Sequence, residues 1–554
     1  MNFSKLQIYI AIFMVITICN TMVFAQNIPK ILQNNSVNDL NYLPDFSFAG
    51  YYNGEGDISK SKGTIIKASD YGVVANDALD DSKALLQAIE SVSKMEGHVI
   101  LQLPKGRLIL SEILYLERSQ FILRGSGSGT GGTELYFPRP LMYSKDSESL
   151  KELREYLVKF DKRQREKEHN IDLAFSQYAW AGGFIWTRVP DVRVKAYLDK
   201  YDQPVDVLAQ VSNGKRGSFS FEVSDVQLLK VGDVVELQLF NKDGEHGAII
   251  SELYKNEKVK VGSHHWNFPE LPLVKQQFKI VKISGKTVTV NCPLTIDILS
   301  TYKAQLVSWK HLEDIGIEHL KITFPYAPPV AHHVEQGFNA IYLTRVYNSW
   351  INDVTIENAD SGVLTEEIAN VTIKNVTTTG DHLAHYTVMM QGTYNVLAQN
   401  IKVYNKVVHP LSFNTFATKS VYTNCEVFTE PILDQHSGAN HQNLFDNIKV
   451  HITPNTDNSY PLFAGGGAGY WKPSHGAYST FWNINVHIED SLGASAILLN
   501  GMEDGPYARV IGVHGNHALK LSYGPNAHVE LTNKALKAIP SLYEYQLNKR
   551  LKKN

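Results

Sequence analysis

One short pattern recurs through the second half of the chain and limits the folds that this sequence can adopt. Six segments carry an asparagine between two apolar stretches: "TIENAD", "TIKNVT", "AQNIKV", "YTNCEV", "FDNIKV" and "FWNINV". Aligning them gives one column of six asparagines, separated by 17, 25, 24, 23 and 36 residues: Asn358, Asn375, Asn400, Asn424, Asn447 and Asn483. A repeat of about 20 to 50 residues with one strand–turn–strand signature is typical of a solenoid.

The asparagine column has a physical reason. An asparagine at the same turn of each coil can hydrogen-bond the asparagines above and below it, and it tolerates the left-handed backbone that tight turns need. The apolar residues on either side would fill the interior of coils stacked about 4.8 Å apart. We therefore expect an all-β protein, a single-stranded parallel β-helix, whose site-bearing coils span residues 301–535.

The N-terminal part of the chain indicates a helix followed by short strands. In "DYGVVANDALDDSKALLQAIESVSKMEGHVILQLPKGRLIL", Asp80 or Asp81 can cap a helix whose apolar side chains from Leu85 to Val92 share one face. Residues 65–137 resemble the start of pectate-lyase-superfamily proteins, in which a "DYG..ND..DD...L..AI" segment forms the helix that caps the first coil. The resemblance implies a right-handed parallel β-helix with an N-terminal capping helix and a carbohydrate-active protein. It does not indicate which reaction.

The remaining segments differ in composition. Charged residues dominate from about 145 to 172, and short strands alternate with turns such as "NKDG" and "ISGK" between about 200 and 300. We expect a signal peptide over 1–25, a linker over 26–64, and a cap with first coils and a helical insertion over 65–199. An inserted β-rich subdomain then spans 200–300. A C-terminal helix over 536–554 follows the site-bearing coils, and we expect it to cover the last coil.

The first residues indicate export. Lys5 precedes the apolar run "IYIAIFMVITI", and "VFA" before Gln26 has the small-residue pattern of a signal-peptidase site. We expect a periplasmic or secreted monomer. No second apolar run approaches the roughly 20 residues that span a bilayer, so we expect no membrane span. The net charge of -3 does not favour a nucleic-acid partner.

Positions can be counted from the column asparagine of each coil, and polar residues at similar counts should lie on the same face of the coils. Ten positions after Asn375 comes His385, and nine after Asn400 comes His409. Ten and twelve positions after Asn424 come Asp434 and His436, which share a strand face because side chains alternate. We expect these four residues to stack along one groove as catalytic residues, with Asp434 orienting a histidine.

Flanking segments supply further candidates. On the glycine-rich loop, Lys472 and His475 are expected to be catalytic, and Lys472 to pair with an acidic group of the substrate. Aromatic side chains stack on sugar faces, and polar groups orient them. The expected substrate-binding residues are Asp381, His382, Asn440, His441, Tyr470, Trp471 and Arg509.

Other polar residues are interpreted as structural. Asp360, Glu366 and Glu367 indicate a solvated turn. The pairs His264–His265 and His332–His333 have no partner at ligand spacing, so we interpret both as loop residues.

The chemistry that suits such a column is β-elimination of an acidic polysaccharide, containing uronate or sulfate. His409 or His436 would remove the proton α to a carboxylate, and Lys472 would neutralise that carboxylate. A glycoside hydrolase that uses two carboxyl groups and a non-catalytic polysaccharide-binding β-helix remain alternatives. No cofactor is firmly implied. Members of the superfamily often use calcium, but no compact acidic cluster demands it here.

Overall fold

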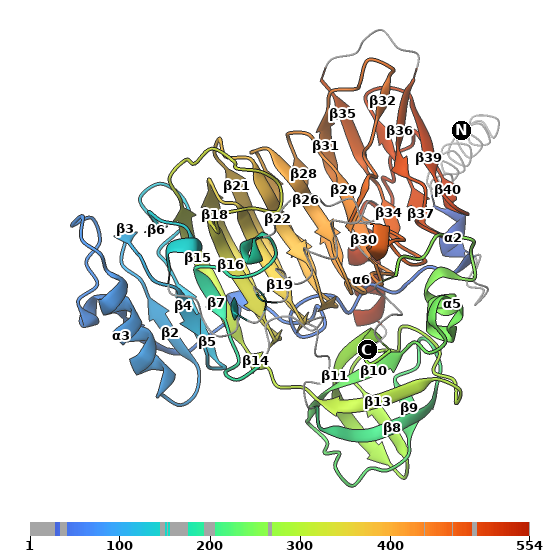
Figure 1. Ribbon diagram of the computed structural model, residues 1–554, viewed down its shortest axis with the longest axis horizontal. Helices are drawn as coiled ribbons and strands as arrows, with labels where there is room; N and C mark the ends of the chain where they lie inside the picture. Colours follow the sequence, from blue (N-terminus) through green and yellow to red (C-terminus); the bar gives the residue numbers. More distant parts are fainter. Residues whose placement is uncertain are drawn as a thin grey trace, which may run out of the picture.

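The computed structural model describes residues 28–33, 41–144, 150, 151, 153, 155, 176–192, 205–263, 269–436, 438–467, 469–489 and 496–552. The predicted signal peptide, most of the charged insertion, and His264 and His265 lie outside these residues. Within them the chain winds into stacked coils whose strands pair in parallel from one coil to the next, and a barrel lies beside the coils (Figure 1).

The largest sheet follows the coils from the first to the last. Within the described residues it has 19 strands, paired in parallel. They are β1 (Thr64–Lys67), β2 (Val99–Gln102), β3 (Gly106–Ile109), β5 (Phe121–Arg124), β6 (Thr133–Tyr136), β15 (Ile315–Thr323), β18 (Trp350–Glu357), β21 (Thr372–Thr379), β24 (Leu397–Gln399), β25 (Lys402–Val403), β27 (Val421–Thr423), β28 (Glu426–Val427), β30 (Leu444–Asp446), β31 (Lys449–Ile452), β34 (Thr480–Trp482), β35 (Asn485–Ile488), β37 (Arg509–Ile511), β38 (His514–Gly515) and β40 (His528–Glu530). Its inward apolar residues belong to one continuous core.

A second parallel sheet forms another side of the coils and carries the candidate site. In spatial order its strands are β33 (Gly465–Gly466), β29 (Leu433–His436), β26 (Val407–Phe413), β22 (Ala384–Met390), β19 (Ser361–Glu366), β16 (Asn339–Thr344), β7 (Ile185–Thr187) and β4 (Leu114–Leu116). Two shorter sheets complete the coils: β14 (Leu312–Glu313), β17 (Val346–Tyr347), β20 (Ile368–Ala369) and β23 (Thr393–Tyr394), then β32 (Ser459–Tyr460), β36 (Ile497–Met502) and β39 (Leu519–Tyr523). The expected all-β parallel architecture is confirmed.

The asparagine column stands at one corner of these coils. Asn400 donates its side-chain amide to Asn375 at 3.0 Å, Asn447 donates to Asn424 at 2.7 Å, and Asn483 donates to Asn447 at 2.9 Å. All five have φ between 52° and 57°, the left-handed region that asparagine tolerates better than most residues. The left-handed backbone is thus present at every position, whereas the hydrogen-bonded ladder is interrupted after Asn400, because Asn424 donates to Glu544 of the C-terminal helix at 3.2 Å.

Asn358 is a correction to this column. It lies after β18, where its side-chain oxygen accepts the backbone N–H of Asp381 at 2.9 Å. Asp353 takes the place expected for it, since it has φ 56° and its neighbours Asn352 and Val354 pair with Lys374 and Val376 on either side of Asn375. Asn375 donates to the adjacent Asn352 at 3.0 Å. The first separation of 17 residues was shorter than the others because Asn358 belongs to a different corner of the coil.

Residues 207–308 leave the coils and close into an antiparallel barrel. Its strands are β8 (Val207–Gly214), β9 (Ser220–Val223), β10 (Val234–Phe240), β11 (Pro272–Ser284), β12 (Thr287–Val290) and β13 (Lys303–Ser308), with helix α5 (Ala248–Tyr254) between β10 and β11. The barrel has its own apolar core, which extends to Tyr347 and Tyr394 of the coils. A hydrogen bond of 2.8 Å from Gln276 Nε2 to the Tyr394 hydroxyl crosses the junction.

Helices lie outside the coils. The helix α2 (Lys30–Gln33) is short, and α3 (Ser82–Ser93) packs Leu85, Ile89 and Val92 into the core at the N-terminal end of the stack (Figure 1). The C-terminal helix α6 (Leu542–Leu551) was expected to cover the last coil. Instead its buried residues Leu542 and Tyr543 pack against outward residues of the long sheet from several coils: Leu397, Val421, Leu444, Trp482 and Ile511.

Two single features complete the description of the fold. Cys292 and Cys425 are free, buried thiols. Among the described residues, no helix combines the length and apolar composition needed to cross a membrane.

Candidate active site

Five histidines gather on the outward face of the second sheet and on a loop that covers it. They are His332 and His333 from the loop between β15 and β16, His385 from β22, His409 from β26 and His436 from β29; together they are called the histidine cluster. Ring centroids of His385 and His409 lie 5.5 Å apart, and those of His409 and His436 lie 4.5 Å apart. The structure thus brings together His385, His409, Asp434 and His436, the residues selected by counting from the asparagine column.

These residues follow their ladder asparagines by nearly equal numbers of positions, but they do not lie side by side in the register of the sheet. His409 pairs in register with Tyr386, and Asp434 pairs with Ser412. The side chains meet because Asp434 and His436, two positions apart on β29, share a strand face, while Leu433 packs in the core. Gly466 of β33 closes this end, since a Cβ there would stand 1.8 Å from His436 Nδ1.

The inner group of the cluster is His409, Asp434 and His436, and all three are buried. The Nδ1 atoms of His409 and His436 lie 3.3 and 3.4 Å from the same oxygen, Asp434 Oδ2. Neither contact has hydrogen-bond geometry, and both ring nitrogens of His409 remain buried without a partner. Ser412 Oγ donates to the same Asp434 oxygen at 2.5 Å.

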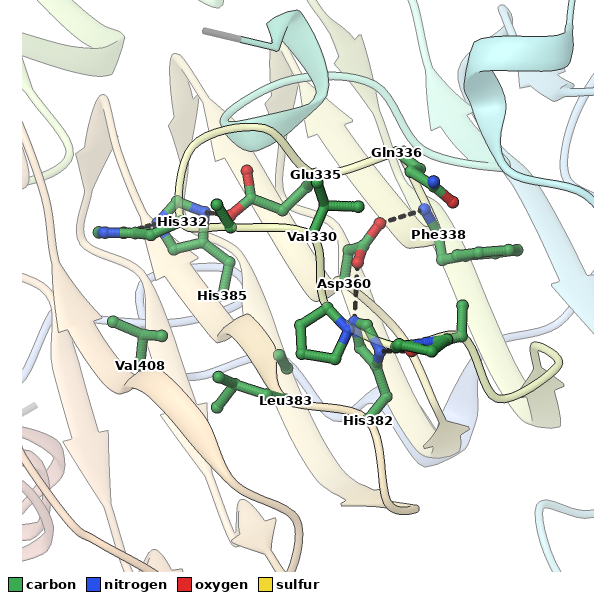
Figure 2. Close-up of a pocket in the computed structure, with 15 residues that line it drawn as sticks. Val330, His332, Glu335, Gln336, Phe338, Asp360, His382, Leu383, His385 and Val408 are labelled. Carbon is green, nitrogen blue, oxygen red and sulfur yellow. Dashed lines mark hydrogen bonds and ion pairs between the residues drawn. The ribbon is translucent and has the colours of Figure 1, made fainter. Parts of the chain in front are cut away.

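The outer group is a chain of contacts at the edge of a cavity. His385 Nδ1 lies 3.0 Å from Glu335 Oε1, and His385 Nε2 lies 3.0 Å from His332 Nε2. His385 is buried, whereas His332 is exposed. Figure 2 shows Glu335, His385 and His332 together at one side of the cavity, which has a volume of about 200 Å³.

Burial and mutual repulsion set the charge of these groups. Burial and the neighbouring histidines lower the pKa of His385 well below its ordinary value and that of His333 to about 2. Burial, aided by the charge of Asp360, raises the pKa of Glu335 to about 7. Burial also raises the pKa of Asp434, but His409 and His436 outweigh it and hold that pKa well below the usual range. The outer group therefore combines neutral imidazoles with a carboxyl that titrates near neutral pH.

Asp360 and His382 hold the covering loop in place. Asp360 Oδ2 accepts the backbone N–H groups of Gly337 and Phe338 at 2.9 and 2.8 Å, and Oδ1 lies 2.8 Å from His382 Nε2. His382 Nδ1 contacts the carbonyl of Ala327 at 2.5 Å. Both ring nitrogens of His382 are thus engaged, so its place is structural even though it lines the cavity with the outer group (Figure 2).

Several interpretations made from the sequence need correction. His332 and His333 are not isolated loop residues, because the loop folds back onto β22. Glu335 was not selected at all. The sequence feature that could have indicated Glu335 is its position two residues after the pair His332–His333. Asp360, Glu366 and Glu367 are all buried and do not form a solvated turn.

Lys472 and His475 lie at the far end of the site. Lys472 Nζ donates to Ser474 Oγ at 2.8 Å and lies 3.6 Å from Asp504 Oδ2. Burial is the main cause that lowers the pKa of His436, and the positive charge of Lys472 adds to it. His475 is buried, with its two ring nitrogens 2.6 Å from the Gly476 carbonyl and 2.6 Å from the Tyr523 hydroxyl. This places His475 among structural contacts and outside the histidine cluster.

The expected substrate-binding residues scatter. Arg509 is buried elsewhere, donating to the carbonyls of Tyr42 and Tyr507. Asn440 donates to the Ser474 carbonyl at 2.8 Å, and His441 Nδ1 contacts the Ala439 carbonyl at 3.1 Å, so both stabilise a turn.

Of the remaining three, Trp471 is half-buried with its carbonyl bonded to Gly438 N–H, and Asp381 is exposed. The side chain of Tyr470 lies outside the described part of the chain.

The donor atoms of the site do not fit calcium. In the described chain, two groups have the spacing to hold a metal: His332, His333 and His385, and His409, Asp434 and His436. Calcium takes six to eight oxygen ligands, whereas imidazole nitrogen suits zinc and its transition-metal neighbours. The calcium allowed by the family resemblance therefore has no fitting site among these residues.

No model of a known protein family matches the chain, and no curated protein sequence matches it. Solved structures show distant likeness. The tailspike protein gp49 from Pseudomonas phage LKA1 is 12% identical, with 85% of this chain and 81% of that chain covered and a TM-score of 0.46. DFA-IIIase from Arthrobacter chlorophenolicus A6 without its lid is 12% identical, covering 84% and 93%, with a TM-score of 0.37. The Azotobacter vinelandii mannuronan C-5 epimerase AlgE4 A-module is 10% identical, covering 84% and 99%, with a TM-score of 0.34. At these identities and scores, the likeness does not identify an activity of this chain.

Proposed function

We propose that this protein is an exported, carbohydrate-active enzyme that cleaves an acidic polysaccharide by β-elimination. The observation that carries the proposal is the chain of contacts from Glu335 through His385 to His332, which ends on an exposed imidazole at a cavity. A carboxylate that fixes the tautomer of one histidine, which in turn contacts a second, is an arrangement for moving a proton. The carbohydrate substrate follows from the resemblance of residues 65–137 to the pectate-lyase superfamily.

The proton transfer assigns a role to each residue. In the proposed transfer, the ionised Glu335 carboxylate, 3.0 Å from His385 Nδ1, turns to accept its N–H. This leaves His385 Nε2 to accept from His332 Nε2–H. The other ring nitrogen of His332 then takes the proton α to the uronate carboxylate. As the carbon–oxygen bond at the β position breaks, a carbon–carbon double bond forms, and the leaving oxygen receives the proton that His332 has gained.

This assignment moves the base away from His409 and His436, which the sequence favoured. Both are buried, and both ring nitrogens of His409 are closed off within the protein. The cavity is lined by His332, Glu335 and His385 and not by His409 or His436. Lys472, at the far end, is the cation we assign to an acidic group further along the polymer.

A glycoside hydrolase is the second candidate, and one observation favours it. The pKa of Glu335 is raised to about 7 while that of Asp434 is held low, a contrast that suits an acid and an ionised partner.

Product analysis separates these activities. Purified full-length protein is incubated with a panel of uronate-containing and sulfated polysaccharides. A lyase yields the ultraviolet absorbance of an unsaturated uronate, and we expect this result with at least one uronate polymer. New reducing ends without that absorbance would support the hydrolase. Binding with neither product would contradict both enzymatic readings.

A further inference from the structure

The inner group of the histidine cluster raises a separate question, because its buried polar atoms lack partners. His409 has two ring nitrogens buried without a hydrogen bond, and His436 Nδ1 is in the same state. A neutral imidazole carries one donor and one acceptor, and leaving such groups unsatisfied inside a protein is unfavourable. Buried polar atoms without partners in a native protein need an explanation, such as an ion.

The spacing of the three groups supplies that explanation. The two imidazole Nδ1 atoms lie 3.3 and 3.4 Å from Asp434 Oδ2, too poorly angled for hydrogen bonds. Ligands placed about 2.0–2.2 Å from a tetrahedral zinc ion are separated from one another by about 3.3–3.6 Å. Both imidazole nitrogens therefore lie at the spacing of neighbouring ligands from the carboxylate oxygen, and one ligand atom from each of the three residues lies within 4.8 Å of the others.

From this geometry we infer that His409 Nδ1, His436 Nδ1 and Asp434 Oδ2 bind one divalent transition-metal ion, zinc in preference. Two nitrogens and one carboxylate oxygen match the ligands that zinc takes, and three protein ligands leave a fourth position open. Ser412 Oγ, which donates to Asp434 Oδ2 at 2.5 Å, orients the carboxylate as an outer partner. The site joins β26 to β29 and does not depend on the β-elimination proposed above.

The second histidine group is the competing location for an ion. His332, His333 and His385 also lie within ligand spacing. However, His385 and His332 already contact each other through Nε2 at 3.0 Å, and Glu335 lies at His385 Nδ1. The outer group therefore has one hydrogen bond between its imidazoles, although His385 Nδ1 lacks one, whereas neither ring nitrogen of His409 has any. A water molecule between the inner ligands is the other way to satisfy these atoms.

The test measures metal directly on the full-length protein. After chelator treatment and dialysis, zinc binding is measured by calorimetry and by elemental analysis, and cobalt(II) is added to read its visible spectrum. We expect one equivalent of zinc per chain in the wild type and a cobalt spectrum of low coordination number. His409→Gln and Asp434→Asn should weaken zinc binding by at least about 100-fold. Ser412→Ala should weaken it by roughly 10- to 100-fold, the range for an outer partner.

Matched variants decide the location. His333→Gln in the outer group and His528→Gln, which lies near Glu530 in β40, should both keep one equivalent. Loss of zinc in His333→Gln with retention in His409→Gln would overturn the assignment. So would a wild-type protein that binds no zinc or cobalt, the result expected if water fills the site. Should a ligand variant fail to fold, the wild-type stoichiometry and the His333→Gln comparison still give the answer.

Discussion

At the scale of single residues, the site depends on partners that lie far apart in the sequence. Glu335 precedes His385 by 50 positions, yet its carboxylate is 3.0 Å from that ring. Counting from the asparagine column selected His385, His409, Asp434 and His436, because each follows its ladder asparagine by nearly the same number of residues. Counting could not select His332 or Glu335, since the covering loop has no ladder asparagine and its position depends on the contacts between Asp360 and the loop backbone.

The acid limb of the pH profile tests the role of Glu335. Burial, with the charge of Asp360, raises the pKa of Glu335 to about 7, and the proposed proton transfer needs the ionised form. Wild-type activity should therefore fall as the pH drops through about 7. Glu335→Gln should lower activity and remove this limb, because an amide has no proton to gain. A variant that keeps the same limb would assign the titration to another group.

The ladder can be tested at Asn447, which donates to Asn424 and accepts from Asn483. Asn447→Ala loses both bonds and places an ordinary side chain at φ 52°, so the free energy of unfolding should fall by about 1–3 kcal/mol. Asn447→Gly loses the same bonds without that backbone strain. The glycine variant should therefore melt above the alanine variant. Equal melting temperatures would mean that the left-handed backbone contributes nothing measurable.

At the scale of elements, the barrel is joined to the coils through a buried ion network. Glu367, next to β20, contacts Lys275 of β11 at 2.5 Å and also pairs with Arg345 of the coils. All three side chains have low exposure, and Glu236 adds a further negative charge near Lys275. The sequence indicated a solvated turn here, because nothing in "ENADSGVLTEE" shows that a lysine 92 positions earlier would cover it.

This network gives the junction a predictable pH dependence. Burial raises the pKa of Glu367, but Arg345 and Lys275 outweigh it and lower that pKa to about 2. Because the folded-state pKa lies below the ordinary value, the stability from ionised Glu367 is full above about pH 5 and is lost as the pH falls toward 2. Glu367→Gln should lower the melting temperature most near neutral pH and least in acid.

An exposed ion pair provides the control for this junction. Lys406 and Glu430 are 2.8 Å apart, and both are largely exposed, so Glu430→Gln should change the melting temperature little at any pH. An effect of Glu367→Gln that does not vary with pH would contradict the ionic account of the junction.

At the scale of the whole molecule, the repeat predicted the fold more fully than it predicted the site. A column of left-handed asparagines and apolar neighbours is a local signature, and it specifies parallel coils without knowledge of distant contacts. The sequence did not predict that α6 runs along the outer face of the long sheet, because its partners Leu397, Val421 and Leu444 come from three different coils. Arg509 was placed wrongly for the same reason: its carbonyl partner Tyr42 is 467 positions away.

The neighbouring histidines His332 and His333 offer the most direct test of the central claim, that a proton moves along Glu335, His385 and His332. The measurement is kcat/KM for elimination on whichever uronate polymer proves active, compared between His332→Gln and His333→Gln. Loss of a general base costs about 10²- to 10⁴-fold, so His332→Gln should fall by that factor while His333→Gln stays close to wild type, with both variants folded by circular dichroism. Full activity in His332→Gln, or an equal loss in both variants, would contradict the account.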